Sequence, residues 1–215
     1  MDSLKTISDL AADCEDGEVQ ELARACISAF EANDEYHPKF LLALDSLIFK
    51  LSKDSGELDA REKLLLLSLG LREKLSGANS LMLTPYLRQL TYLFCFKRDL
   101  KQASMYAERL VFNCSSNLPP QNPQLIDSLY MLAAIEHKLG HLATAERFYI
   151  RVLKNLAENS QQCPISLSEV TGRYQMLLKT AGREAEAASL DRIHYTPGMT
   201  RDRVFSLLNQ LSKAM

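Results

Sequence analysis

The sequence has no strong excess of charge of either sign. Its 25 basic and 27 acidic side chains leave a formal net charge of −2 over 215 residues. A surface that binds nucleic acid or an anionic membrane needs a concentration of basic residues. We therefore expect neither nucleic acid nor a membrane among the partners of this protein.

Long hydrophobic runs are also missing. The richest apolar stretch, 64–71, is interrupted by Ser68 and Gly70. It is also much shorter than the roughly 20 apolar residues that a membrane-spanning helix needs. The first residues are acidic at Asp2 and lack the apolar core of a signal peptide, so none is expected.

The five cysteines lack the spacing of a metal or redox site. Even the closest pair, Cys14 and Cys26, is 12 positions apart, whereas zinc and dithiol motifs place cysteines within a few positions of each other. An odd number of cysteines also excludes a complete set of internal disulfides. We interpret the thiols as reduced, which predicts a cytoplasmic protein.

Motifs for catalysis are absent as well. The sequence contains no glycine-rich phosphate-binding loop, no Gly-x-Ser-x-Gly and no His-Glu-x-x-His. His137 and His141 have the spacing of a helical metal pair, but Gly140 between them predicts a turn. We therefore expect no catalytic residue, no metal and no cofactor, and an enzyme built on this scaffold is the weaker alternative.

What the sequence does contain is an internal repeat of 42 residues. Glycine recurs at Gly56, Gly140 and Gly182, and Arg98 stands in the same register. The same period relates leucines and alanines, namely Leu58, Leu100, Leu142, Ala103, Ala145 and Ala187. The first copy has Arg61 at the alanine position. A fixed period of this kind indicates a solenoid of repeated supersecondary units.

Each period predicts a helix, a tight turn and a second helix. Apolar residues recur at three- and four-residue steps over 129–139 and again over 148–156. Gly140 between them can adopt the left-handed conformation that ends a helix. Prolines fall in the stretches 114–124 and 159–166, which predicts linkers between successive repeats.

The third copy of the repeat resembles the tetratricopeptide repeat (TPR) family. Its large, small, glycine and aromatic positions follow the family signature: Leu129-x-x-Leu132-Ala133, then Gly140-x-Leu142-x-x-Ala145-x-x-x-Tyr149-x-x-Val152. The usual TPR period is about 34 residues, and the longer period here is similar to that of kinesin light chain repeats. The resemblance implies an all-α, right-handed solenoid of helical hairpins with flanking terminal helices.

The resemblance also implies how the chain is organised. We expect one α-solenoid domain over 1–215, with four TPR-like repeats of 42 residues in 42–195. N-terminal helices would occupy 1–37, and a capping helix would occupy 200–215. Terminal helices of this kind cover the apolar faces that end repeats would otherwise expose.

TPR solenoids commonly bind a peptide or helix of a partner in a concave groove formed by the first helices of successive repeats. The resemblance implies that eight side chains line this groove: Arg88, Tyr92, Phe96, Tyr130, His137, Lys138, Met176 and Lys179. We therefore expect a scaffold or adaptor whose protein partner offers a segment of acidic character.

Three alternatives stay open at this point. One is a secretion-type or assembly chaperone that holds a substrate protein, and another is a self-assembling structural subunit, that is, a homo-oligomer. The third concerns Tyr92, Phe96 and Met176, which could pack against neighbouring helices or the terminal helix instead of facing a groove.

Overall fold

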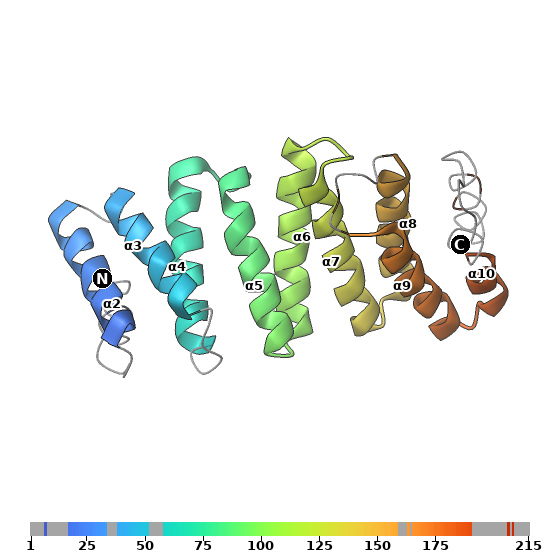
Figure 1. The fold of residues 1–215 in the computed structure, drawn as a ribbon, viewed down its shortest axis with the longest axis horizontal. Helices are drawn as coiled ribbons and strands as arrows, with labels where there is room; N and C mark the ends of the chain where they lie inside the picture. The colour runs from blue at the N-terminus through green and yellow to red at the C-terminus, as the bar shows by residue number, and fades with distance from the viewer. Residues whose placement is uncertain are drawn as a thin grey trace. The chain divides into compact units, whose positions relative to one another are not determined.

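The computed structural model of the chain describes residues 7, 17–33, 38–51, 58–158, 163, 165–190, 206 and 208. All regular elements in this part of the chain are helical (Figure 1). They are α2 (Gly17–Asn33), α3 (Pro38–Leu51), α4 (Leu58–Ser76), the 3-10 helix η1 (Leu81–Leu83), α5 (Thr84–Phe96), α6 (Leu100–Asn117), α7 (Pro123–Leu139), α8 (Leu142–Glu158), α9 (Leu167–Thr180) and α10 (Glu184–Ser189). The predicted all-α fold class is confirmed.

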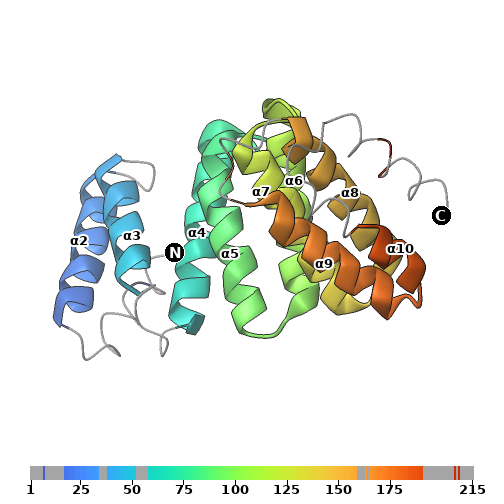
Figure 2. The same ribbon diagram turned by 45° about the vertical axis from the view of Figure 1, so that its right-hand side comes forward.

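The chain forms two compact units, Met1–Leu93 and Phe94–Met215. In the first unit α2 packs on α3, and α3 packs on α4. In the second unit α6 packs on α7, α7 on α8, α8 on α9, and α9 on α10 (Figures 1 and 2). Within each unit the helices thus contact their neighbours in sequence, as repeats do. The single domain over 1–215 stays a prediction.

The turns of the second unit follow the predicted register. Gly140 ends α7 with φ of 82°, and Gly182 follows α9 with φ of 74°. Arg98, one period before Gly140, has φ of 61° and is the one positive-φ residue other than glycine in the described ranges. This conformation costs an L-residue roughly 1–2 kcal/mol. The turn between the two helices therefore imposes a left-handed backbone on Arg98 that arginine does not favour. Gly56, in the same register, lies outside the described residues.

The alanine register is confirmed by burial. Ala103 and Ala145 are 0% exposed and Ala187 is 1% exposed. Small side chains at these positions allow the helices to approach closely, because a larger side chain would overfill the contact. The first unit differs, since Arg61 is only half-buried and donates a long hydrogen bond of 3.4 Å to Gln89 Oε1.

The linkers are shorter than predicted, because helices extend into them. In the stretch 114–124, α6 continues to Asn117 and α7 already begins at Pro123. Asn122 caps α7 by accepting a hydrogen bond from the backbone of Gln124, and proline suits the first helical position, where no N–H is needed. Ser166 caps α9 in the same way.

The predicted terminal helices are described only in part. In the N-terminal region 1–37, where helices are expected, the structure shows α2. Ile7, Ser206 and Leu208 are helical, and the rest of 1–16 and of 200–215 lies outside the described residues. The capping role of 200–215 therefore stays a prediction.

Candidate functional site

The eight predicted groove residues lie on α5, α7 and α9. Arg88 and Tyr92 belong to the first unit, and the other six belong to the second. Tyr92, Phe96 and Met176 are 53%, 66% and 63% exposed. These three side chains are therefore not buried by the described residues, and their place in a groove stays a prediction.

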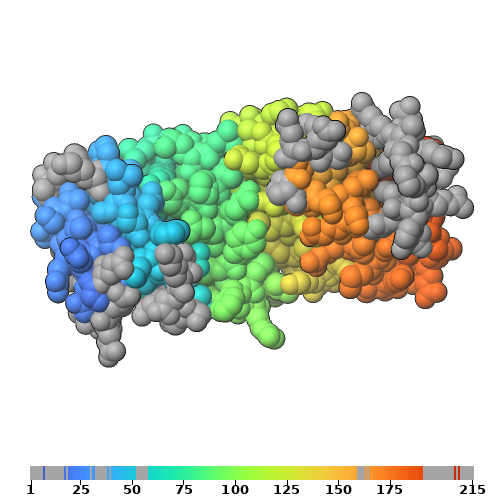
Figure 3. Space-filling view, in the orientation of Figure 1, coloured from blue at the N-terminus to red at the C-terminus, as the bar shows by residue number. Residues whose placement is uncertain are grey.

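A polar cluster joins α7 to α9 within the second unit. The Tyr130 hydroxyl of α7 donates to Glu169 Oε1 of α9 over 2.7 Å. The same hydroxyl accepts from Arg173 Nε over 3.0 Å, with the guanidinium carbon 6.0 Å from the centre of the Tyr130 ring. Figure 3 shows the yellow surface of α7 beside the orange surface of α9. Arg173 is absent from the eight predicted residues and is the main addition that the structure makes.

Tyr149 of α8 lies beneath this cluster. Its ring makes edge contacts with Tyr130 and His137, each at 6.3 Å between centroids, and stacks on Tyr174 at 6.2 Å. The side chain is 0% exposed. Its hydroxyl has no hydrogen-bond partner among the described residues. Buried polar groups are normally paired, so this hydroxyl calls for an explanation.

The titratable groups of the cluster respond to burial and to the charge of Arg173. Burial lowers the pKa of His137, and the charge of Arg173 lowers it further. Burial raises the pKa of Tyr149 to about 12, while Arg173 offsets part of that rise. Burial and the hydrogen bond to Glu169 raise the pKa of Tyr130 to about 12. At neutral pH the cluster thus holds neutral tyrosines and a largely neutral His137 around one guanidinium.

The remaining predicted residues lie around this cluster and not in it. Lys138 is exposed, and its charge offsets part of the effect of burial, which raises the pKa of the Cys95 thiol. Cys95 directly precedes the exposed Phe96 on α5. Met176 and Lys179 are exposed farther along α9, and no contact given for the described residues joins them to Tyr130 or His137.

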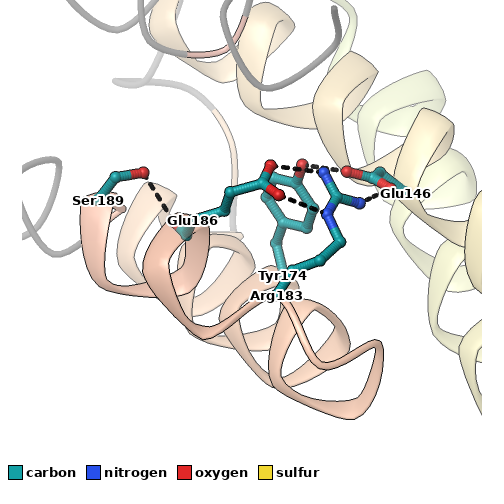
Figure 4. A network of polar contacts seen from close by, with 5 residues as sticks. All are labelled: Glu146, Tyr174, Arg183, Glu186 and Ser189. Atoms are coloured by element: carbon teal, nitrogen blue, oxygen red, sulfur yellow. Dashed lines mark hydrogen bonds and ion pairs between the residues drawn. The ribbon is translucent and has the colours of Figure 1, made fainter. Parts of the chain in front are cut away.

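A second network fixes α9 against α8 and α10, and Figure 4 shows it. The buried Glu146 of α8 accepts from the Tyr174 hydroxyl over 2.6 Å and from Arg183 Nη1 over 2.6 Å. Arg183 also donates twice to Glu186 of α10, over 2.7 and 2.6 Å. The hydrogen bond with Arg183 holds the pKa of Glu186 below its ordinary value, although burial opposes this. The network holds the helix that carries Glu169 and Arg173 in place.

The two histidines that the sequence spaces as a metal pair, His137 and His141, have different neighbours. His141 Nδ1 lies 2.8 Å from the buried Glu136 Oε2, whereas His137 faces Tyr149. Over the part of the chain that the structure describes, no group of three His, Cys, Asp or Glu residues could hold a metal ion. Within the same ranges, none of the helices combines the length and the apolar character needed to span a bilayer.

The sequence matches no protein-family model and no curated protein. The structure, in contrast, is similar to TPR-like repeats described as a kinesin light chain from Podosopora anserina, with a TM-score of 0.66, 16% identity, and coverage of 97% of this chain and 96% of that chain. It is also similar to BtubC (BKLC) from P. vanneervenii, with a TM-score of 0.67, 17% identity, and coverage of 94% and 80%. The fold is a TPR-like helical-repeat solenoid.

At these identities the similarity shows the fold alone. TPR-like repeats generally serve as scaffolds for contacts between proteins, because stacked hairpins present an extended surface. The predicted resemblance and fold class are thus confirmed.

Proposed function

We propose that this TPR-like protein is a scaffold or adaptor that binds a peptide or helix of a partner protein. The binding surface would be the α7–α9 face, which we define as Tyr130, His137, Lys138, Arg173 and Met176, together with the adjoining Phe96. The proposal places the protein in the cytoplasm, where its cysteines would stay reduced.

The observation that carries this proposal is the mixture of side chains on this face. Phe96 and Met176 are 66% and 63% exposed, so a partner that covered them would bury apolar surface. Half-buried Tyr130 and His137 and the exposed cations Lys138 and Arg173 lie on the same helices. Aromatic residues and arginine are the side chains that most often dominate binding energy at protein interfaces.

The test compares two triple variants of the full chain. The face variant combines Phe96→Gln, Lys138→Gln and Met176→Gln. The control variant combines Lys101→Gln, Met105→Gln and Phe112→Gln on α6, where the methionine and phenylalanine are 50% and 55% exposed and the lysine is exposed. The two sets change the same residue types and the same charge, so their effects on solubility should be equal.

Wild type and both variants are used as bait in one cell extract, and bound proteins are quantified by mass spectrometry. We expect a partner that the wild type and the control variant retain and the face variant loses. Circular dichroism should confirm that all three are folded. Equal retention by the face variant would place the binding surface elsewhere and refute the proposal.

A further inference from the structure

Two helices of the second unit, α6 and α8, lie parallel to each other. Both pack on α7. Near their first residues, the buried Glu136 of α7 accepts a hydrogen bond from Ser104 of α6 and lies 2.8 Å from His141, which precedes α8. Near their last residues, Gln121, which follows α6, donates to Glu158 of α8 over 2.8 Å. Hydrogen bonds thus connect the starts of the two helices with each other, and their ends likewise.

The 42-residue register places the outward side chains of α6 and α8 on one surface. Ala103 of α6 and Ala145 of α8 share a register position, and both are 0% exposed. The two helices therefore turn the same side inward, and exposed side chains that share a register position point outward together. We define the α6–α8 face by five of them: Met105, Phe112, Arg147, Arg151 and Lys154.

The two helices contribute different chemistry to this face. On α6, Met105 and Phe112 are 50% and 55% exposed. At the equivalent positions α8 has Arg147 and Lys154, with Arg151 between them. Arg147 and Arg151 are exposed and Lys154 is half-buried, and within the described ranges no hydrogen bond or ion pair engages these three side chains. Large apolar side chains on α6 thus stand where the next repeat has cations suited to solvent.

The acidic residues of the two helices do not neutralise the cations of the face. Glu146 of α8 is buried and accepts from Tyr174 and Arg183. On α6, the exposed Glu108 is followed directly by Arg109. The α6–α8 face therefore offers apolar contact along one helix and positive charge along the other.

We propose that the α6–α8 face binds an amphipathic helix of a partner protein whose apolar stripe is bordered by acidic residues. Met105 and Phe112 are seven positions apart, which is about 10 Å along the helix axis. Apolar residues at three- and four-residue steps on a partner helix match this length. The cations of α8 cover the same length and meet carboxylates on the neighbouring side of the partner helix. This site goes beyond the proposed function, because it lies on other helices than the α7–α9 face.

The position of Glu108 favours a protein helix over a lipid surface. Glu108 is exposed and lies between Met105 and Phe112 along α6. Insertion of both apolar side chains into an anionic bilayer would bring this carboxylate against negatively charged headgroups. A partner helix can instead place a neutral or basic side chain opposite Glu108.

The experiment uses a fluorescent, amidated helical peptide of 18 residues, the length of α6. It carries leucine at three- and four-residue steps and glutamate along one side of that stripe. One control peptide has glutamine in place of every glutamate, and a second has the same composition in an order that breaks the stripe. Binding to the full chain is measured by fluorescence anisotropy at low salt. Cosedimentation with phosphatidylserine-containing vesicles tests for a lipid surface.

Three variants of the full chain separate the contributions, and circular dichroism should confirm that each is folded. The apolar variant combines two changes on α6: Met105→Gln and Phe112→Gln. The charge variant combines three changes on α8: Arg147→Gln, Arg151→Gln and Lys154→Gln. A control variant removes the same charge at three exposed positions outside α6 and α8: Arg24→Gln, Lys74→Gln and Arg98→Gln.

We expect the glutamate peptide to bind about tenfold more weakly to the charge variant, because each exposed ion pair contributes little and three act together. Added salt should reduce this difference. The apolar variant should also bind about tenfold more weakly, since two buried apolar contacts are lost. The control variant should bind as the wild type does, and both control peptides should bind the wild type more weakly.

Absence of peptide binding, wild-type affinity in the apolar or the charge variant, or equal binding of either control peptide would overturn this proposal. Vesicle binding that depends on the same side chains, in place of peptide binding, would assign the face to a membrane and would also overturn it. The two proposals fail separately. The α7–α9 triple variant should still bind the peptide, whereas the α6 triple variant should lose the peptide and keep the partner of the α7–α9 face.

Discussion

An arginine, a tyrosine and a carboxylate meet in both units, with different outcomes. In the first unit Arg72 Nη2 donates to Asp45 Oδ2 over 2.7 Å, and the Tyr86 hydroxyl donates to Asp45 Oδ1 over 2.8 Å. Arg72 lies over the Tyr86 ring at 4.4 Å and donates also to Ser68. Its side chain is only 10% exposed.

The second unit has the corresponding cluster of Tyr130, Glu169 and Arg173. Here the arginine is exposed, and within the described residues its terminal nitrogens make no hydrogen bond. The first cluster is closed, because one carboxylate accepts from both partners. The second is open, because its carboxylate accepts from the tyrosine alone. The same three chemical groups thus form a buried, fully bonded cluster in one unit and an exposed cluster in the other.

The largest expected effect is the loss of the closed cluster. Asp45→Ala would leave Arg72 buried without its carboxylate and should lower the unfolding free energy by roughly 2–3 kcal/mol. This is less than the cost at a fully buried pair, because Asp45 is 36% exposed. Glu169→Ala should cost less than about 1 kcal/mol, as at exposed pairs. Urea unfolding of both variants measures the difference. Equal costs would remove the distinction between closed and open clusters.

The alanine register offers a second contrast between the units, because the first unit has Arg61 where the second has Ala145. Ala145→Leu should destabilise by roughly 1–3 kcal/mol, the usual cost of overpacking. Ala143→Leu, at an exposed position of the same helix, should change stability by less than about 0.5 kcal/mol. Thermal melting that is equal for both would mean that Ala145 does not lie at a close helix contact.

A smaller effect is expected at the turns. Arg98→Gly should stabilise by about 0.5–1 kcal/mol, since glycine relieves the left-handed strain but adds freedom to the unfolded chain. Gly140→Ala should destabilise by roughly 1 kcal/mol for the converse reason. A Cβ at Gly140 would meet no atom within 4 Å, so the cost is one of backbone conformation. Chemical denaturation of the two variants should shift in opposite directions.

The smallest effect concerns pH. The pKa of His137 is lowered in the folded protein, so the unfolded chain binds the proton more readily. The contribution of His137 to stability is therefore present above its ordinary pKa of about 6.5 and is lost as pH falls from there through the lowered value. Arg173→Gln should raise the pKa of His137 and weaken this dependence. NMR titration checks the pKa, with His141 as the internal comparison.

The sequence predicted most of the fold because a fixed period constrains it strongly. The 42-residue register predicted that Gly140 and Gly182 lie at turns and that the repeated alanines are buried. These turns in turn predicted where the helical hairpins lie. Arg98 could not be foreseen as strained from its residue type, because arginine has no preference for a left-handed turn. Only the register shared with the glycines indicated it.

The candidate site was predictable only in part. The predicted residues Tyr130 and His137 both contact Tyr149. Arg173 was not among the predicted groove residues, since an exposed arginine on a helix carries no periodic signal. A usable signal existed in the separations along the sequence. Glu169 and Arg173 lie 39 and 43 positions after Tyr130. These separations are three residues less and one residue more than the period of 42. Tyr149 occupies the aromatic position of the signature, but a sequence pattern cannot show that its hydroxyl has no hydrogen-bond partner among the described residues.

The connection of Arg183 to Glu146 has a mechanical consequence. Among the described helices of the second unit, α10 is the last, and Arg183 is the side chain that ties its start to α8. A pulling force applied beyond α10 would therefore act first on this ion pair and then on the contact between α9 and α8. Each residue that passes from helix to extended chain adds about 2 Å of length. The second unit should thus lengthen in steps, one helix at a time from its C-terminal end, and not in a single rupture.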